Sequence, residues 1–355
     1  MHENCSMKQP NGTNKRNGTT RRGAVAPTSG GRALWFWGLI ALALCFSVPA
    51  IAACPEGRVS LYMPAPAGSQ LDLLYGLLDG PWKERTRDTL TMTHLPGRGG
   101  SYAASRLLDD PAEGCSYAAV VLPSLFLLSE TKDLMVDAAD LAIIGALAAA
   151  PNAIWVAADS PHATLGELAA FARQQGETPG GYFGVAGTGS YTDQHLATLA
   201  FDRAAGIKSL YIPVLGSAEA VRAVKSGEAH ACWGYALSPE SMPGMRALGV
   251  AGEKRSPALP DVPTFQEVDV DMVSFSQFAV AVLGTTSEET LEELRASLAA
   301  LVENESLRKE MAVRGFIPLA LGAQDLEAFL EGRRRDAEQS LAEYKLIPKQ
   351  LRRGM

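Results

Sequence analysis

Short apolar runs alternate with amphipathic stretches between residue 58 and about residue 235 of the chain. The apolar runs are rich in β-branched and aromatic residues, which favours buried strands, and the stretches between them repeat apolar positions every three to four residues, as helices do. This alternation is typical of βαβ units, and it predicts an α/β protein with mainly parallel sheets covered by helices. The predicted strands are 59–63, 90–94, 117–122, 182–186, 210–213 and 229–235, and the predicted helices are 70–78, 102–108, 165–175, 194–205 and 218–225.

Two longer apolar runs interrupt this alternation. Residues 142–158 are long enough for two consecutive strands joined at Pro151-Asn152, and residues 274–282 form a second extended run. We interpret both runs as crossings between two lobes. The first lobe then comprises residues 54–153 plus 276–355, and the second comprises residues 154–275.

The N-terminal region has the layout of a secretory signal. Residues 1–33 are polar and basic, residues 34–53 carry no charge, and the apolar stretch ends at the alanine-rich residues 50–53. This order predicts a signal peptide with an extended n-region over residues 1–53, and therefore export to the periplasm. A membrane-spanning anchor is the alternative, because about 20 apolar residues cross a bilayer, but no basic cluster follows Cys54.

The charge of the exported part argues against binding to nucleic acid. Of the 32 basic and 39 acidic side chains, six and one lie in residues 1–53, so the remainder carries a formal charge near −12. Nucleic-acid binding needs a basic surface that displaces counterions from phosphate. We therefore expect no nucleic-acid partner.

Three cysteines, Cys54, Cys115 and Cys232, follow the predicted signal, and their spacing does not match a paired metal site. Residues 51–54 resemble a bacterial lipobox, in which Cys54 would be acylated and would anchor the protein to lipid. Alternatively, Cys54 and Cys115 stand just before the first and third predicted strands, which would bring them to one end of a parallel sheet. A disulfide between them in an oxidising compartment is therefore the competing prediction, and Cys232 is expected to be a buried free thiol.

Five segments match, in order and spacing, the receptors of tripartite tricarboxylate transporters, which are also called Bug proteins. Residues 64–72 resemble the family's loop after the first strand, and residues 94–101 are similar to its Pro-Gly-x-Gly-Gly turn. The other three segments are residues 187–190 with 195–196, residues 213–217 with 225–228, and residues 245–250 running into 255–267. Together they cover the chain from about residue 58 to residue 345.

This resemblance implies a two-lobed periplasmic-binding-protein fold, similar to type II, with the ligand cleft between the lobes. It also implies a receptor that captures a small organic carboxylate and delivers it to the membrane permease of a tripartite transporter. We expect a monomer without a cofactor or a metal. The chain departs from the family pattern at Ala65, Ser69, Val214-Leu215 and residues 232–235, so the ligand of a relative cannot be assigned to it.

Two segments share one physical design, in which a strand leads through a glycine-rich turn into the start of a helix. In residues 64–72 and 186–192 the glycines allow a tight turn with exposed N–H groups, and the helix start adds a partial positive charge. Such ends bind carboxylates without Arg or Lys, and two of them in different lobes could hold one carboxylate. The predicted ligand-binding residues are Gly68, Ser69, Gln70, Asp72, Gly187, Thr188, Gly189, Ser190, Thr192, Gly216, Ser217 and Tyr235.

Several side chains near these turns have two interpretations. By resemblance Asp72 holds the loop or meets a ligand group, whereas as a first-turn acid it stabilises its own helix. Arg98 either reaches the cleft or faces solvent. Trp233 and Tyr235 occupy alternate strand positions, which face opposite sides of a sheet, and we favour Tyr235 for the cleft.

Catalysis is the rival class of function. Ser190, Asp193 and His195 lie on one helix start, where capping and solvation explain them. Residues 184–189 lack the full Gly-x-Gly-x-x-Gly pattern and the following acid of a dinucleotide site. We therefore predict no catalytic residues and no enzyme activity. A receptor that signals to a membrane sensor is a further alternative, because both uses depend on lobe closure by the ligand.

Overall fold

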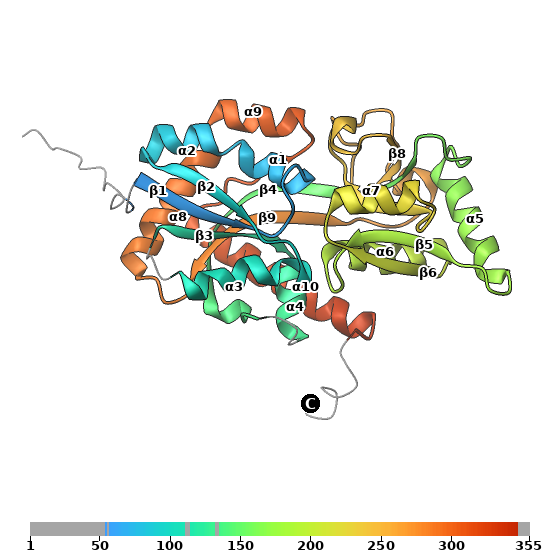
Figure 1. Cartoon of the computed structure of the whole chain (residues 1–355), viewed down its shortest axis with the longest axis horizontal. Coiled ribbons are helices and arrows are strands. Elements are labelled where there is room, and N and C mark those ends of the chain that lie inside the picture. Colours follow the sequence, from blue (N-terminus) through green and yellow to red (C-terminus); the bar gives the residue numbers. More distant parts are fainter. Residues whose placement is uncertain (1–53, 55–56, 111–113, 132–134, 347–355) are drawn as a thin grey trace, which may run out of the picture. The chain divides into compact units, whose positions relative to one another are not determined.

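The structure is a computed structural model of the 355-residue chain, and it describes residues 54, 57–110, 114–131 and 135–346. The predicted signal peptide, residues 1–53, lies outside the described residues. Within the described ranges, no helix is both long enough and apolar enough to cross a membrane. These ranges contain a ten-stranded mixed sheet with helices on its faces (Figure 1).

The helices and strands predicted between residues 58 and 235 are present within a few residues of their expected bounds. Two helices of this region, α2 (Asp79–Thr86) and α4 (Ser124–Glu130), were not predicted. The first five residues of α4 are all buried, so it has no polar face to reveal the period. The strands are β1 (Arg58–Met63), β2 (Thr89–His94), β3 (Ser116–Leu122), β4 (Leu141–Ala157), β5 (Phe183–Thr188), β6 (Ser209–Val214), β7 (Ala231–Tyr235), β8 (Met245–Val250), β9 (Phe275–Leu283) and β10 (Ile317–Pro318). The helices are α1 (Gln70–Gly76), α2 (Asp79–Thr86), α3 (Ser101–Asp109), α4 (Ser124–Glu130), α5 (Leu165–Glu177), α6 (Asp193–Ala205), α7 (Ser217–Lys225), α8 (Glu288–Val302), α9 (Glu305–Val313) and α10 (Ala323–Glu343).

Two groups of parallel strands form the two ends of the sheet, whose order is β2-β1-β3-β9-β4-β7-β5-β6. Strand β1 is parallel to β2 and β3, and β5 is parallel to β6 and β7, as the βαβ pattern predicts. Strands β4 and β9 are antiparallel to their partners and connect the two groups. The predicted α/β fold with two lobes is therefore confirmed, whereas the lobe limits at residues 153/154 and 275/276 remain a prediction.

Strand β4 is one continuous strand, so the prediction of two strands joined at Pro151-Asn152 is wrong. The strand changes neighbours at this point, because it pairs with β9 up to Pro151 and with β7 from Asn152 onward. The backbone polar groups at the change are all bonded: Pro151 O accepts from Ala236 N at 2.9 Å, and Asn152 N donates to Ser274 O at 2.9 Å. Since proline has no N–H to satisfy, it fits the strand at the position where one partner ends.

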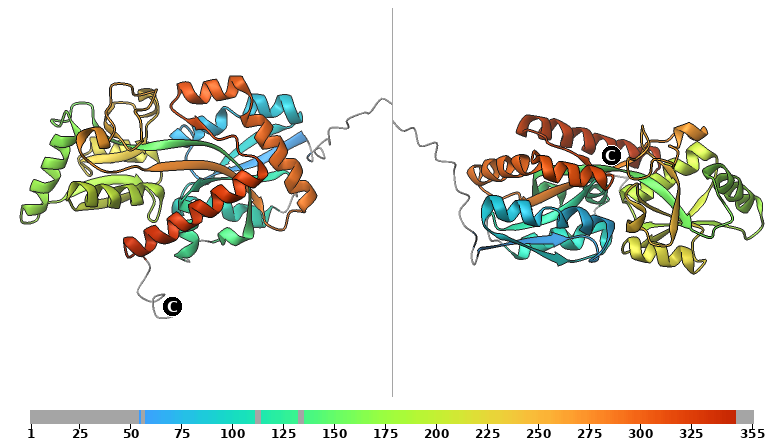
Figure 2. Two further views of the ribbon diagram at one scale, coloured as in Figure 1. Left: turned by 180° about the vertical axis from the view of Figure 1, so that it is seen from behind. Right: turned by 90° about the horizontal axis from the view of Figure 1, so that it is seen from above.

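Helices cover both faces of each group of strands (Figures 1 and 2). In the first group, apolar residues of α1, α2, α8 and α9 pack on one face and those of α3, α4 and α10 pack on the other. In the second group, α5 and α6 pack opposite α7. The loops at the strand ends, which no helix covers in this way, are left to form the site.

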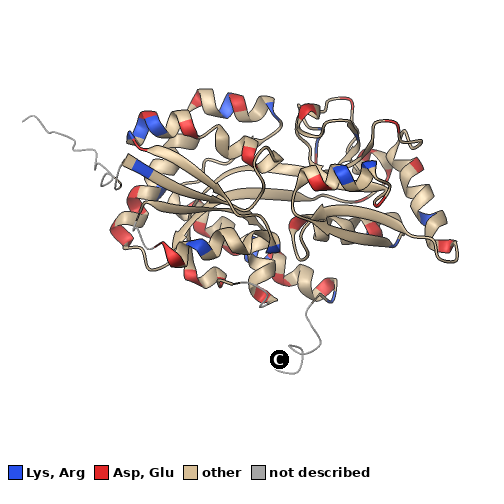
Figure 3. Ribbon diagram, viewed as in Figure 1, with Lys and Arg blue, Asp and Glu red and all other residues tan. Residues whose placement is uncertain are grey.

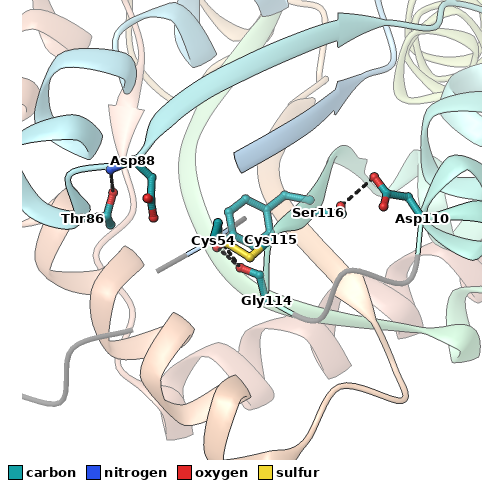
Figure 4. The surroundings of a disulfide bond; sticks show 8 residues. Cys54, Thr86, Asp88, Asp110, Gly114, Cys115 and Ser116 are labelled. Carbon is teal, nitrogen blue, oxygen red and sulfur yellow. Dashed lines mark hydrogen bonds between the residues drawn. A yellow bond between two sulfur atoms is a disulfide. The ribbon is translucent and has the colours of Figure 1, made fainter. Parts of the chain in front are cut away.

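A disulfide joins Cys54 and Cys115, whose Cα atoms lie 5.6 Å apart (Figure 4). The parallel pairing of β1 with β3 brings the two residues together, as Ser60 N donates to Cys115 O at 2.9 Å. Acylation of Cys54 would use the same sulfur atom, so the two modifications exclude each other. Cys232 is a buried free cysteine, and burial raises the pKa of its thiol.

Charged residues lie mainly on the helices and loops, where acidic and basic residues are interspersed (Figure 3). The basic run in α10 illustrates this arrangement. Arg333 pairs with Asp336 at 2.8 Å, Arg335 lies 4.0 Å from Glu331, and the Arg334 guanidinium lies 4.9 Å from the centre of the Phe126 ring. The basic side chains of this run therefore have local partners of their own.

Candidate ligand-binding site

A cavity of about 370 Å³ lies where loops from both groups of strands meet. Its walls are formed largely by the connections that follow parallel strands, which is where α/β proteins bind their ligands. The lining residues are Pro64, Ala65, Ser69, Gln70 and Leu71 after β1; Gly97, Arg98, Gly99 and Gly100 after β2; Val121, Ser124 and Leu128 at β3 and α4; Thr188, Gly189, Ser190, Thr192, Asp193 and Gln194 after β5; Pro213, Val214, Leu215, Gly216, Ser217 and Glu219 after β6; and Tyr235 at the end of β7.

The structure brings together nine of the twelve residues proposed from the sequence. Ser69, Gln70, Thr188, Gly189, Ser190, Thr192, Gly216, Ser217 and Tyr235 all line the cavity. Trp233 faces the opposite side of β7, where its Nε1 donates to Thr198 Oγ1 at 2.8 Å in the core. This is the arrangement expected for alternate positions of a strand.

Gly68, Asp72 and Gly187 do not line the cavity, and each contacts another part of the protein instead. Gly68 N donates to Asp72 Oδ2 at 2.7 Å, and Asp72 Oδ1 lies 2.7 Å from His94 Nε2. Asp72 therefore holds the loop after β1 rather than facing a ligand. A Cβ atom on Gly187 would lie 2.6 Å from the hydroxyl of Tyr211, so this glycine makes room for a ring of the neighbouring strand.

Gln70 was proposed as a ligand donor, but both ends of its side-chain amide bond to protein. Oε1 accepts from Tyr235 N at 2.9 Å, and Nε2 donates to Tyr235 O at 3.3 Å and to Ser241 Oγ at 2.8 Å. Gln70 follows β1, whereas Tyr235 ends β7 in the other group of strands. The side chain is buried at 3% exposure and ties the two groups together beside the cavity.

Glycine turns from the two groups of strands meet across the cavity. Gly99 and Gly189 have φ angles of +60° and +70°, which glycine adopts without strain. A Cβ atom on Gly189 would lie 3.3 Å from both N and Cα of Gly99, so the two backbones touch. A Cβ atom on Gly216 would lie 2.8 Å from Cδ of Pro66, a second contact of this kind. Substituted turns could not approach as closely.

Asp193 begins α6 and places a buried carboxyl group in the cavity wall. Its Oδ1 accepts from Ser124 Oγ at 2.9 Å, its Oδ2 accepts a short hydrogen bond from Ser276 Oγ, and its backbone N donates to Ser124 Oγ at 3.0 Å. Burial raises the pKa of the Asp193 carboxyl, and the serine hydroxyls oppose that rise. The residue thus joins α6 to α4 and β9.

The side-chain amide of Gln194 has N–H groups in the cavity wall that can donate to a ligand. Its Oε1 accepts from Thr188 N at 2.8 Å, which orients the amide, and its Nε2 has no protein hydrogen-bond partner among the described residues. The N-terminus of α7 lies nearby in the wall, where Gly216 is the N-cap and supplies no side chain to the first turn. Free backbone N–H groups at such an end favour an anion.

Two further charged residues line the cavity. Glu219 uses a carboxylate oxygen to accept from Leu215 N at 2.9 Å, so it caps the start of α7. Arg98, for which two interpretations were open, is both exposed and part of the lining, and its backbone has a φ angle of +46°.

The residues Ser190, Asp193 and His195 do not act on one another. His195 Nδ1 accepts from Tyr191 N at 3.1 Å, its ring stacks on Tyr211 at 4.6 Å, and burial lowers its pKa. The Asp193 carboxyl is bonded to Ser124 of α4 and Ser276 of β9. His195 therefore serves the local structure of the helix start, as expected from the spacing, whereas the partners of the Asp193 carboxyl lie on α4 and β9.

The proposed set lacked Gly99, Ser124, Asp193 and Gln194. A usable signal existed for Gly99 and Ser124, because each lies at the end of a predicted parallel strand, the edge at which α/β sites form. Asp193 and Gln194 could not be recognised as site residues from the sequence. They lie in the first turn of a helix, where acids and amides often occur for structural reasons.

Comparison with known proteins agrees with this architecture. The family model of the tripartite tricarboxylate transporter family receptor matches residues 88–343. The chain is similar to the UPF0065 protein in gbd 5'region of Cupriavidus necator, with 25% identity over 277 residues, which is 78% of this chain and 84% of the relative.

Two solved structures are similar in fold. A Rhodopseudomonas palustris protein solved with adipate has a TM-score of 0.72 and 24% identity over 80% of this chain and 96% of that chain. MatC from Rhodopseudomonas palustris, solved with malate, has a TM-score of 0.67 and 17% identity over 81% of this chain and 97% of that chain. The family match spans well over half of the sequence, and the chain belongs to the receptors of the tripartite tricarboxylate transporter family.

Proposed function

We propose that this protein captures a small organic carboxylate in the cavity between its lobes and delivers it to the membrane permease of a tripartite transporter. The family consists of periplasmic solute-binding receptors. The observation that carries the proposal is the meeting of two glycine turns, at Gly99 and Gly189, over a cavity whose wall includes a helix N-terminus. A small anion enclosed there would contact both groups of strands.

The polar groups of the cavity suit a carboxylate. The Gln194 amide and the first turn of α7 supply N–H donors, and Ser190 and Ser217 add hydroxyl groups. Hydrogen bonds to a charged group contribute roughly 1.5–3 kcal/mol each. The partial positive charge of the α7 terminus adds about 0.3–1 kcal/mol, so binding needs no side chain with a formal positive charge.

Structures of similar proteins support this class of ligand. The two Rhodopseudomonas palustris proteins hold adipate and malate, which are both dicarboxylates. A cavity of about 370 Å³ has room for a chain of this size. We therefore propose an aliphatic dicarboxylate as the first class to test.

Export and anchoring are part of the same proposal. A periplasmic receptor meets an oxidising environment, in which the Cys54–Cys115 disulfide is stable. Because the disulfide uses the Cys54 sulfur, we propose a free periplasmic protein rather than one anchored through a lipid on Cys54.

The function is tested by thermal unfolding of residues 54–355 with a panel of monocarboxylates, dicarboxylates and tricarboxylates. A true ligand at about 100 times its dissociation constant stabilises the protein by roughly 2.7 kcal/mol. Uptake of that ligand by membrane vesicles that contain the permease should then require the added protein. Failure of every carboxylate to raise the melting temperature would overturn the proposal.

A further inference from the structure

The turn after β5 is held at both polar groups of the Gly189 backbone. Gly189 N donates to Val214 O at 3.1 Å. Its carbonyl oxygen accepts from the Tyr211 hydroxyl at 2.8 Å and from Thr192 Oγ1 at 3.1 Å. Gly189 and Thr192 line the cavity, whereas Tyr211, which lies on β6, does not. The carbonyl group of Gly189 is therefore directed at a residue outside the lining.

The Tyr211 ring has a defined position next to this turn. A Cβ atom on Gly187 would lie 2.6 Å from the Tyr211 hydroxyl oxygen and 2.8 Å from the ring atom Cε2, so a side chain there would displace the ring. The ring also stacks on His195, with the ring centres 4.6 Å apart. Burial raises the pKa of the Tyr211 hydroxyl, so the group keeps its proton and acts as a donor.

The direction of the Gly189 carbonyl also sets the direction of the next N–H group. The bond between Gly189 and Ser190 is a trans peptide, in which the C=O and the following N–H point in opposite directions. The Ser190 N–H therefore points away from Tyr211. Ser190 lines the cavity, and its N–H has no protein hydrogen-bond partner within the described part of the chain. An N–H group in this position can donate to a ligand carboxylate.

Glycine leaves the orientation of this peptide dependent on its hydrogen bonds. Gly189 has a φ angle of +70°, and glycine adopts φ angles of either sign without strain. Local sterics therefore do not prevent the peptide from turning over. A peptide turned over would direct its carbonyl oxygen at the ligand carboxylate, and repulsion is stronger in a buried site than in water.

We propose that Tyr211 is a positioning residue for ligand binding, whose hydroxyl holds the Gly189–Ser190 peptide with its N–H directed at the bound carboxylate. This inference rests on the proposed function and adds a residue that does not itself touch the ligand. It also explains Gly187, which was expected to bind the ligand: the absence of its side chain admits the Tyr211 ring.

The variant Tyr211→Phe removes only the hydroxyl group. Calorimetric titration of residues 54–355 with succinate, glutarate and adipate measures the affinity for each acid. We expect the variant to bind the preferred acid about three- to thirtyfold more weakly, a partial loss because Thr192 still donates to the Gly189 carbonyl.

The matched control is Tyr117→Phe. The Tyr117 hydroxyl also donates to a glycine carbonyl, Gly114 O, at 2.8 Å, and Tyr117 is buried but does not line the cavity. Its variant loses the same kind of hydrogen bond and should bind the preferred acid like the wild type.

Nuclear magnetic resonance of the ¹⁵N-labelled protein reports on the Ser190 N–H itself. In the wild type, the Ser190 amide proton should move downfield when the acid binds, because it donates to a charged oxygen. In Tyr211→Phe this shift should become smaller. A purely structural role for Tyr211 predicts that both the affinity and the Ser190 shift stay as in the wild type.

Unchanged affinity in Tyr211→Phe, or a loss no larger than that of Tyr117→Phe, would overturn the inference and leave the proposed function intact. Absence of a Ser190 shift in the wild type would also overturn it, and that measurement needs no variant to fold. If no carboxylate binds to the wild type, the proposed function itself fails.

Discussion

The side-chain amide of Gln70 pairs with the backbone N–H and C=O of Tyr235, a residue 165 positions away in the sequence. The two hydrogen bonds reproduce the donor and acceptor pattern of a strand neighbour, at the place where β7 ends beside the cavity. One side chain thus links the loop after β1 to the end of β7, where Tyr235 lines the cavity. Because this link joins the two groups of strands beside the cavity, we expect it to influence how closely the lobes approach each other.

Replacing Gln70 with Ala is expected to destabilise the protein. The change leaves buried groups of Tyr235 without their partner, which costs about 1–3 kcal/mol. Chemical denaturation of the variant measures the loss. Gln174→Ala is the matched control, because Gln174 is exposed on α5, and its variant should unfold like the wild type. Equal stability of the two variants would show that the Tyr235 contact contributes nothing.

The Cys54–Cys115 disulfide leads to predictions for the mass of the exported protein and for its free energy of unfolding. The exported protein should carry no lipid at Cys54, and reduction should raise its mass by the two hydrogens of the opened bond. Loss of the bond in the Cys54→Ser, Cys115→Ser double variant should cost about 2–5 kcal/mol. Cys232→Ala should keep the mass change on reduction, since Cys232 is a free cysteine. A diacylglyceryl adduct on Cys54 would contradict this account.

The buried Asp193 carboxyl predicts a pH dependence of stability. Burial raises its pKa in the folded state, so the folded protein holds this proton more tightly than the unfolded chain does. The resulting stabilisation is complete below the unfolded pKa of about 3.9 and is lost as the pH rises through the folded pKa.

The variant Asp193→Asn should remove this part of the dependence. Its free energy of unfolding, measured from pH 4 to pH 8, is expected to fall less with rising pH than that of the wild type. Asp325→Asn, which replaces an exposed acid of α10, provides the comparison. Parallel curves for Asp193→Asn and the wild type would mean that the buried carboxyl does not titrate in this range.

Much of the fold was predictable because its signals are local. Strands such as β1 and β5 are short apolar runs with glycine turns behind them, and the periodic helices between them identify βαβ units. The continuity of β4 could not be predicted from its own residues. Whether the chain breaks at Pro151 depends on which strands pair with β4 on either side of it. A proline that ends one pairing and begins another looks, in sequence, like a turn.

The candidate site was predictable only where one segment contains both the turn and the helix start. Thr188, Gly189 and Ser190 met that condition, and they line the cavity. The roles of Gln70 and Asp193 depend instead on partners that are 165 and 83 residues away, Tyr235 and Ser276. No local pattern distinguishes an amide that binds a ligand from one that binds a distant backbone.

We expect closure of the lobes over the ligand to depend on the absence of a side chain at Gly216. Its backbone is extended, with a φ angle of 178°, so alanine fits the local conformation. The added Cβ atom would lie 2.8 Å from Cδ of Pro66, in the loop after β1. Overpacking of this size costs about 1–3 kcal/mol. The cost applies only when the lobes are closed, and it therefore reduces affinity more than stability.

The most direct test is calorimetric titration of the mature protein and two glycine variants with the carboxylate that most stabilises it. Gly216→Ala should lower the affinity by about five- to hundredfold. Gly176→Ala, in a helix where no atom lies within 4 Å of the new Cβ, should bind like the wild type. Unchanged affinity in Gly216→Ala would contradict the claim that the ligand is held between lobes that close at this glycine.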